Sequence, residues 1–186
     1  MKRLVLTLSL AAGLLVAVAA TAAVAHNDNG KGKARLDSYQ EAPLTLSTTG
    51  TGSFRIRVRS DGLHYTLRYS GVSAPVTQAH IHFGRTGLAG GIIAFLCGPQ
   101  PQAGDKPVCP ATEGTVEGVI DMADIIGPAN QGIAAGELTE TIRALRKGAV
   151  YANVHTTAFP GGEIRGQVGS NGNKNGNGKK RDRDDD

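Results

Sequence analysis

Apolar and polar residues alternate along two neighbouring segments of this 186-residue chain. From Phe54 to Arg59 each apolar residue is followed by an arginine, and from Leu63 to Tyr69 apolar residues again occupy every second position. A period of two is typical of a strand with one buried face, and Ser60-Asp61-Gly62 between the segments is a turn signal. The pattern predicts an antiparallel hairpin. Its arginines are interpreted first as the solvated face of the strand and second as an anion-binding stripe; they are Arg55, Arg57 and Arg59.

Other segments extend this pattern into a domain. Further strands are predicted at Leu36 to Glu41, Val76 to Phe83, Ile92 to Cys97, Gly114 to Ile120, Val150 to His155 and Glu163 to Val168. From Gly136 to Lys147 the apolar residues instead recur at spacings of four and three, acids lie early, bases lie late, and Gly148 follows, which predicts a helix. Residues 36–168 are therefore expected to form an all-β domain, an antiparallel β-sandwich or flattened Greek-key barrel with one short crossover helix.

The N-terminus has the pattern of an export signal. Two basic residues precede an apolar run from Leu4 to Ala20, and Ala23-Val24-Ala25 offers a cleavage site before His26. Residues 1–25 are thus predicted to be a signal peptide, with an uncleaved anchor helix as the alternative. Cleavage would leave no membrane span and would place the protein in the periplasm, at the cell surface or in the medium.

Both ends of the expected mature chain are polar and rich in glycine. Residues 26–35 predict a disordered linker, and residues 169–186 predict a disordered charged tail. The net charge of +4 comes from the signal segment (+2), the linker (+2) and the tail (+1), because residues 37–168 hold ten bases and eleven acids. A nucleic-acid binder concentrates its bases on the folded part, usually among aromatic residues, so no nucleic-acid partner is expected.

The two cysteines, Cys97 and Cys109, flank a loop rich in proline and glycine. Export would place them in an oxidising compartment, where such a loop gains stability from covalent closure, so we expect a disulfide. A metal-thiolate site is the alternative, but it needs more ligands than two cysteines provide.

Three histidines are the candidate metal ligands. His80 and His82 share one face of a predicted strand, about 6.5 to 7 Å apart, and His155 ends another predicted strand. Three imidazoles are the minimum set for a zinc or copper ion, and convergence would bring their ring nitrogens within about 4 Å of one another. The alternative is that they make ordinary polar contacts with backbone carbonyls or a carboxylate.

Several segments around these histidines resemble the chordin-type (CHRD) domain. The matching segments are Ser70 to Val72, Pro75 to Gly84, Gly87 to Ile93 and Tyr151 to Gln167. The resemblance implies an extracytoplasmic β-sandwich module with no firmly assigned activity. The leading interpretation is a non-enzymatic binding or structural module whose partner is an unidentified extracytoplasmic protein or surface ligand, and the alternative is a copper- or zinc-binding protein.

A more distant similarity is to Cu/Zn superoxide dismutase, which is also a β-sandwich. His80, His82, His155 and Arg165 follow the order of its copper-binding histidines and its anion-guiding arginine. Its zinc-binding loop has no counterpart here, which argues against dismutase activity, and the chain contains no nucleophile motif that would indicate another enzyme. The preferred interpretation of Arg165 is a structural ion-pair residue, because Glu163 and Arg165 share one strand face and can pair with each other or with neighbours.

Overall fold

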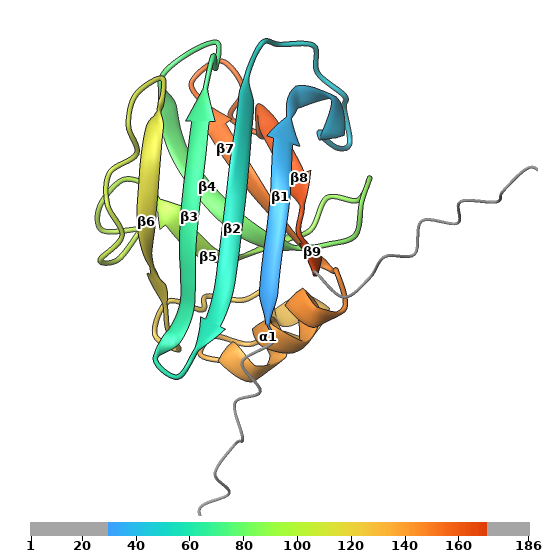
Figure 1. Ribbon diagram of the computed structural model, residues 1–186, viewed down its shortest axis with the longest axis vertical. Coiled ribbons are helices and arrows are strands. Elements are labelled where there is room, and N and C mark those ends of the chain that lie inside the picture. The colour runs from blue at the N-terminus through green and yellow to red at the C-terminus, as the bar shows by residue number, and fades with distance from the viewer. Residues whose placement is uncertain (1–29, 171–186) are drawn as a thin grey trace, which may run out of the picture.

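The computed structural model describes residues 30–170, which form nine antiparallel strands and one α-helix (Figure 1). The strands are β1 (Lys31–Asp37), β2 (Thr51–Arg59), β3 (Gly62–Ser70), β4 (Val76–Phe83), β5 (Gly91–Cys97), β6 (Gly114–Ile120), β7 (Val150–Thr156), β8 (Ile164–Gln167) and β9 (Gly169–Ser170). The helix is α1 (Leu138–Arg146), and two short 3-10 turns are η1 (Ser38–Gln40) and η2 (Ala129–Gln131). The predicted signal peptide, the first residues of the linker and the tail beyond Ser170 lie outside the described residues.

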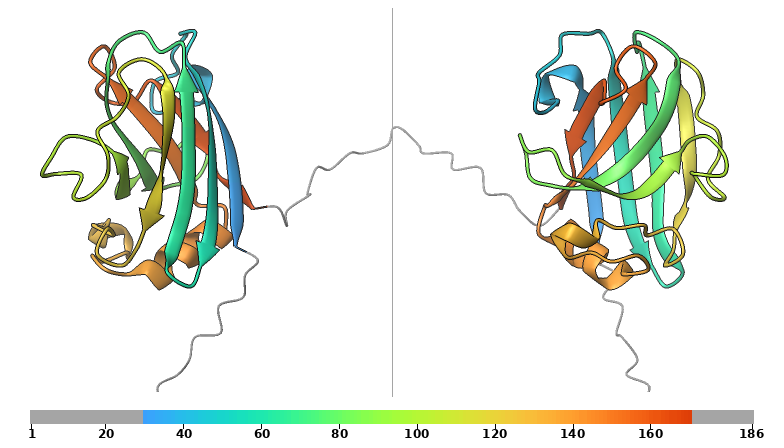
Figure 2. Two further views of the ribbon diagram at one scale, coloured as in Figure 1. Left: turned by 60° about the vertical axis from the view of Figure 1, so that its left-hand side comes forward. Right: turned by 180° about the vertical axis from the view of Figure 1, so that it is seen from behind.

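The strands form one nearly closed sheet. Its order is β5-β4-β7-β8-β1-β2-β3-β6, with β9 paired to β1, and the two end strands β5 and β6 lie beside each other. The sheet folds over into a front layer of β1, β2, β3 and β6 and a back layer of β4, β5, β7 and β8, as the side and rear views show (Figure 2). The predicted all-β class with one helix is confirmed.

The hairpin predicted from alternation is the centre of the front layer. β2 and β3 pair antiparallel in a register that places Phe54 opposite Leu67 and Ile56 opposite Tyr65. These four side chains are buried in the core between the layers, whereas the arginines of β2 are exposed. The solvated-face interpretation of the arginine row is therefore confirmed.

The first strand begins earlier than the sequence pattern predicts. Lys31 to Arg35 belong to β1 and pair with β2, so the linker prediction is wrong for these residues. The inward positions of this half of the strand are Gly32 and Ala34, whose small size hides the alternation. A Cβ on Gly32 would lie 2.4 Å from Cγ1 of Val168, so only glycine fits this close approach.

The boundaries of two other elements also differ. Only the first two residues of the strand predicted at Leu36 to Glu41 belong to a strand, because the backbone N–H of Gln40 bonds to the Asp37 carboxylate and the chain turns at η1. The helix predicted from Gly136 to Lys147 is shorter, since α1 spans Leu138–Arg146. It follows β6, precedes β7 and covers one end of the two layers (Figure 1). The side chains of Ile142 and Leu145 are buried there.

The cysteines form the predicted disulfide. Cys97 ends β5 and bonds to Cys109, which closes the intervening loop. Within that loop the buried Lys106 ammonium lies 2.5 Å from Asp105 and 2.7 Å from Asp124. Among the described residues, no helix has the length and apolarity needed to cross a membrane.

The close packing of Gly32 gives a stability prediction. Replacing Gly32 by Val should lower the free energy of unfolding by about 1–3 kcal/mol, because the new side chain must displace Val168 and Ile56. The matched change Lys33→Val, on the exposed face of the same strand, should alter stability by no more than about 0.5 kcal/mol. Urea denaturation measures both, and equal stability of the two variants would show that this segment does not pack as a strand in solution.

Candidate metal centre

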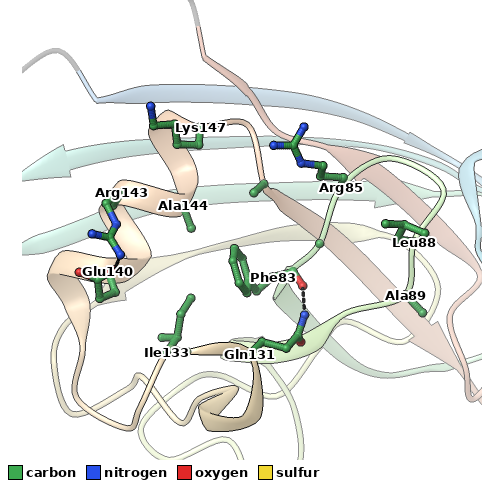
Figure 3. A pocket seen from close by; sticks show the side chains of 13 residues that line it. Phe83, Arg85, Leu88, Ala89, Gln131, Ile133, Glu140, Arg143, Ala144 and Lys147 are labelled. Carbon is green, nitrogen blue, oxygen red and sulfur yellow. Dashed lines mark hydrogen bonds and ion pairs between the residues drawn. The ribbon is translucent and has the colours of Figure 1, made fainter.

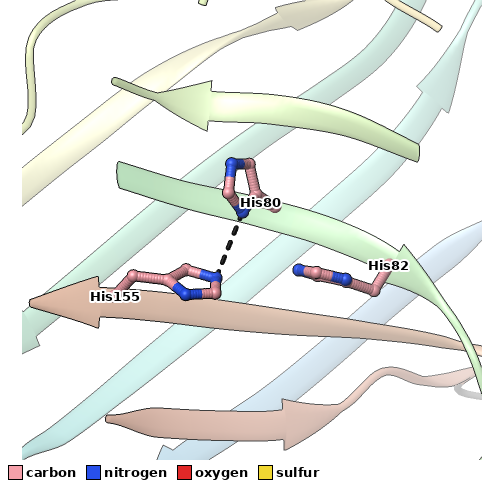
Figure 4. A group of neighbouring side chains, drawn as sticks. All are labelled: His80, His82 and His155. Carbon is pink, nitrogen blue, oxygen red and sulfur yellow. Dashed lines mark hydrogen bonds between the residues drawn. The ribbon is translucent and has the colours of Figure 1, made fainter. Parts of the chain in front are cut away.

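Neighbouring strands of the back layer bring the three histidines together (Figure 4). His80 and His82 project from the same side of β4, as the period of a strand requires, and β7 carries His155. β4 and β7 pair antiparallel with Gln78 opposite His155 and Asn153 opposite His80, so His155 is diagonal to His80. The sequence could not show this register, which depends on contacts between segments about 75 residues apart.

The imidazoles are within reach of a single ion but do not yet have the spacing that bound ligands would have. Nδ1 of His80 lies 3.1 Å from Nε2 of His155, and one ring nitrogen from each of the three residues lies within 4.8 Å of the others. This limit is wider than the roughly 4 Å expected for ligands about 2.0–2.1 Å from one ion. Ring movements on the order of 1 Å would close the difference.

The face of β4 and β7 that carries the three histidines is buried and not solvent-exposed. The exposed fraction is 0% for His80 and 6% for both His82 and His155. The ring of Phe95 packs edge-on against His80, with the ring centroids 4.4 Å apart. Both sides of β4 are therefore covered, the inner side by the core and the outer side by this aromatic ring and by loops.

Backbone carbonyls orient two of the three rings. Nδ1 of His82 lies 3.0 Å from the carbonyl oxygen of Gly90, and Nδ1 of His155 lies 2.9 Å from that of Pro160. A carbonyl can only accept a hydrogen bond, so each Nδ1 carries the proton and each Nε2 carries a lone pair. Backbone carbonyls orient metal-binding histidines in this way in many proteins.

Two buried ring nitrogens have no partner in the described part of the chain. They are Nε2 of His80 and Nε2 of His82. Since Nε2 of His155 has a lone pair, Nδ1 of His80 donates to it, and the proton on Nδ1 leaves Nε2 of His80 as an unpaired acceptor. A buried acceptor without a partner costs free energy. A metal ion between the rings would supply a partner for Nε2 of His82, whereas Nε2 of His80 points away from the other two rings and would reach the ion only after ring rotation.

The rings are neutral in the folded protein. Burial, with a smaller contribution from His155 and His82, lowers the pKa of His80 to about 2. Burial likewise lowers the pKa of His82 to about 4 and lowers the pKa of His155. Neutral imidazole is the form that binds metals, so the three ligands need lose no proton to solvent at neutral pH.

A stack of side chains borders the cluster on the side of His82. The ring of Tyr151 lies parallel to that of His82 at 4.8 Å between centroids, and the Arg165 guanidinium carbon lies 3.5 Å from the centroid of Tyr151. Arg165 is 2% exposed and donates to the carbonyl oxygens of Arg85 and Leu88. It therefore fixes a buried loop contact and does not face solvent as an anion guide would.

The expected ion pair between Arg165 and Glu163 is absent from residues 30–170. Glu163 is fully buried and instead accepts hydrogen bonds from the backbone and hydroxyl of Ser73 and from the hydroxyl of Thr156. The acid near Arg165 is Glu41, which sequence reasoning missed. Burial, only partly offset by Arg165, raises the pKa of Glu41 to about 7.

The loop from Gly84 to Gly90 covers the centre and also borders a cavity. Its carbonyl groups bind His82 and Arg165, and the Tyr151 hydroxyl accepts from the backbone N–H of Gly90 at 3.0 Å. Beyond the loop, a cavity of about 430 Å³ lies between it and α1 (Figure 3). Its lining combines apolar groups with cations and includes Phe83, Ile133, Ala144, Arg85, Arg143 and Lys147.

Fold and site together define a small antiparallel β-domain with one buried histidine cluster. The family model of the CHRD domain matches residues 32–168, and the chain therefore belongs to the CHRD domain family. No curated protein and no solved structure matches the sequence. Membership of the family suggests an extracellular binding or structural module.

The lowered histidine pKa values predict an acid-sensitive fold. Below pH 6.5 these histidines bind protons in the unfolded chain but remain neutral in the folded protein. Their contribution to the free energy of unfolding is therefore fully present above pH 6.5 and is lost as the pH falls. Each histidine contributes a slope of up to about 1.4 kcal/mol per pH unit. The raised pKa of Glu41 acts in the opposite direction, because its contribution is full below pH 4.5 and is lost as the pH rises through about 7.

Two variants separate these contributions. His82→Gln should reduce the acid-induced loss of unfolding free energy, whereas Glu41→Gln should steepen it, and chemical denaturation at a series of pH values measures both. A His82→Gln profile parallel to that of the parent protein would show that His82 is not buried in its neutral form.

Proposed function

We propose that this protein is an exported CHRD-domain binding module that holds one copper or zinc ion between His80, His82 and His155. The observation that carries the proposal is the convergence of three buried imidazoles, with one ring nitrogen of each within 4.8 Å of the others and Nε2 of His82 left without a partner. Ordinary polar contacts do not account for Nε2 of His82, because the hydrogen bond that this ring makes uses Nδ1.

The chemistry of the ligand set favours these two metals. The cluster consists of three neutral imidazoles, and within residues 30–170 it includes no carboxylate or thiolate. Imidazole suits copper and zinc, whereas magnesium and calcium prefer oxygen ligands. His82 and His155 would bind through Nε2, and His80 through whichever ring nitrogen faces the ion after a tautomer shift or ring rotation.

Burial supports a role in binding rather than catalysis. Three strand-borne rings exposed by at most 6%, under a loop fixed by several hydrogen bonds, exclude solvent from the ion. Arg165 makes its contacts with backbone carbonyls and Tyr151, so no observation favours a dismutase-like reaction. Export is supported by the Cys97–Cys109 disulfide, which persists in oxidising compartments.

Metal titration tests the centre. The purified protein, stripped with a chelator, should take up one equivalent of zinc or copper, and His82→Ala should weaken the affinity on the order of 100-fold or more, because two ligands hold an ion much less tightly than three. His64→Ala is the matched control, since His64 lies in the front layer, is partly exposed and bonds to Asp61. Circular dichroism verifies that both variants fold. Equal uptake by parent and His82→Ala proteins would refute the metal site.

The pH dependence of binding gives a second test. Burial lowers the pKa of His80 to about 2 and that of His82 to about 4, and it also lowers the pKa of His155, so protons should compete with the metal less as the pH falls below 7 than they would at exposed histidines. An exposed histidine site would lose affinity as the pH falls through about 6.5, since its ligands protonate there. Competition titrations at several pH values measure the difference, and a steep loss of affinity below pH 6.5 would contradict binding by these buried rings.

A further inference from the structure

The outer face of the front layer concentrates basic side chains. β1, β2 and β3 contribute seven exposed cations to it: Lys31, Lys33, Arg35, Arg55, Arg57, Arg59 and Arg68. We call this set the basic face. Its lysines and Arg35 come from the segment that the sequence pattern assigned to a linker, and only the pairing of β1 with β2 brings them next to the arginine row.

Strand register arranges these cations in columns across the sheet. Lys31 pairs with Arg57, and Lys33 pairs with Arg55. Ser53 pairs with Arg35 on one side and with Arg68 on the other, which makes a third column. Neighbouring columns are about 6.5–7 Å apart along the strands, and neighbouring strands are about 4.7–4.9 Å apart. The basic face therefore carries columns of two cations each, at a regular interval along the strands.

Few acids balance this charge. Those on or beside the face are Asp37, Asp61 and Glu117, and each already bonds to a neighbour: Gln40, His64 and Thr66, respectively. Within residues 30–170 none of the seven cations forms an ion pair. The remainder of residues 31–168 carries six bases and eight acids, so the positive charge is concentrated on this face and is not a property of the whole domain.

Mutual repulsion makes the basic face a site for anions. The spacing of the columns is shorter than the Debye length of about 8 Å at physiological salt, so neighbouring pairs repel one another with little screening. A ligand with anionic groups along its length would relieve this repulsion at several columns at once and release counterions.

We propose that the basic face binds a linear polyanion bearing phosphate or sulfate groups, such as a charged polymer of a cell surface, aligned with the strands. The aromatic residues of β2 and β3 do not support recognition of nucleic-acid bases, because Phe54, Tyr65 and Tyr69 point into the core and offer no stacking surface. Nor does the face expose a large apolar side chain that could insert into a membrane; the exposed ones among residues 30–170 lie outside β1, β2 and β3.

This site is separate from the proposed metal centre, because the histidines lie in the back layer. Binding is therefore tested on the full chain stripped of metal, so failure of one proposal leaves the other unaffected. The probes are inorganic polyphosphate and dextran sulfate, which distinguish phosphate from sulfate as the preferred group. Titration calorimetry at low salt should show binding of at least one of them, with affinity falling on the order of a hundredfold between roughly 50 and 200 mM salt.

Two triple variants with the same net charge locate the site. Lys33→Gln/Arg55→Gln/Arg57→Gln removes three of the four cations in the columns Lys31–Arg57 and Lys33–Arg55 and should weaken binding at least about tenfold. The control, Arg143→Gln/Arg146→Gln/Lys147→Gln, removes three exposed cations at the C-terminal end of α1 and should change the affinity less than about threefold. Thermal denaturation verifies that both fold. Equal losses in the two variants would overturn the proposal, since binding would then follow net charge alone.

Two further probes test the class of partner. Oligo(dT) and vesicles containing phosphatidylglycerol should each bind more weakly than the preferred polymer at matched charge concentration, because they offer bases or a lipid surface that the face has no means to recognise. Tighter binding of oligo(dT) would assign the face to single-stranded nucleic acid. Tighter binding of the vesicles would assign it to a membrane surface. Either result would overturn the assignment to a charged polymer.

Discussion

The antiparallel pairing of β4 with β7 is the interaction on which the candidate site depends. It places His155 diagonally across from His80, and the same register holds Tyr151 opposite His82. Pairing also fixes the backbone, so the rings can adjust only through their side-chain torsions. Any ion that binds here would meet ligands held by strands, which are the most rigid supports the fold provides.

Desolvation controls the chemistry of this cluster. Placing three imidazoles under a loop penalises their charged forms, which is why the pKa of each is lowered. The backbone carbonyls of Gly90 and Pro160 offset part of that cost by accepting the Nδ1 protons. Nε2 of His82 remains without a partner, and a metal ion between the rings would provide one without introducing a buried carboxylate.

The loop from Gly84 to Gly90 connects several parts of this arrangement. Arg165 anchors the carbonyl groups of Arg85 and Leu88, while His82 and Tyr151 bond to Gly90. Arg165 is itself stabilised by the face of Tyr151, which lies against His82. The buried arginine thus has a structural role, since it holds in place the loop that keeps solvent from the histidines.

The basic face of the front layer has opposite properties, because it is exposed and strongly charged. The core between the layers separates it from the histidine cluster.

Local pattern in the sequence determined the strands of the hairpin, the shared face of His80 and His82, and the crossover helix. These features depend on the period of a strand or helix, which neighbouring residues set by themselves. The cysteine pair was also predictable, because its residues flank one short loop. Tertiary structure decided what required pairing between distant segments: the approach of His155, the burial of all three rings, the separation of Glu163 from Arg165, and the place of Gly32 in a strand. Glycine lacks the side chain that would mark an inward position, and no local pattern records which strand lies beside which. For that reason the bases of β1 and the arginines of β2 looked unrelated along the chain, although their registered pairing makes them one surface.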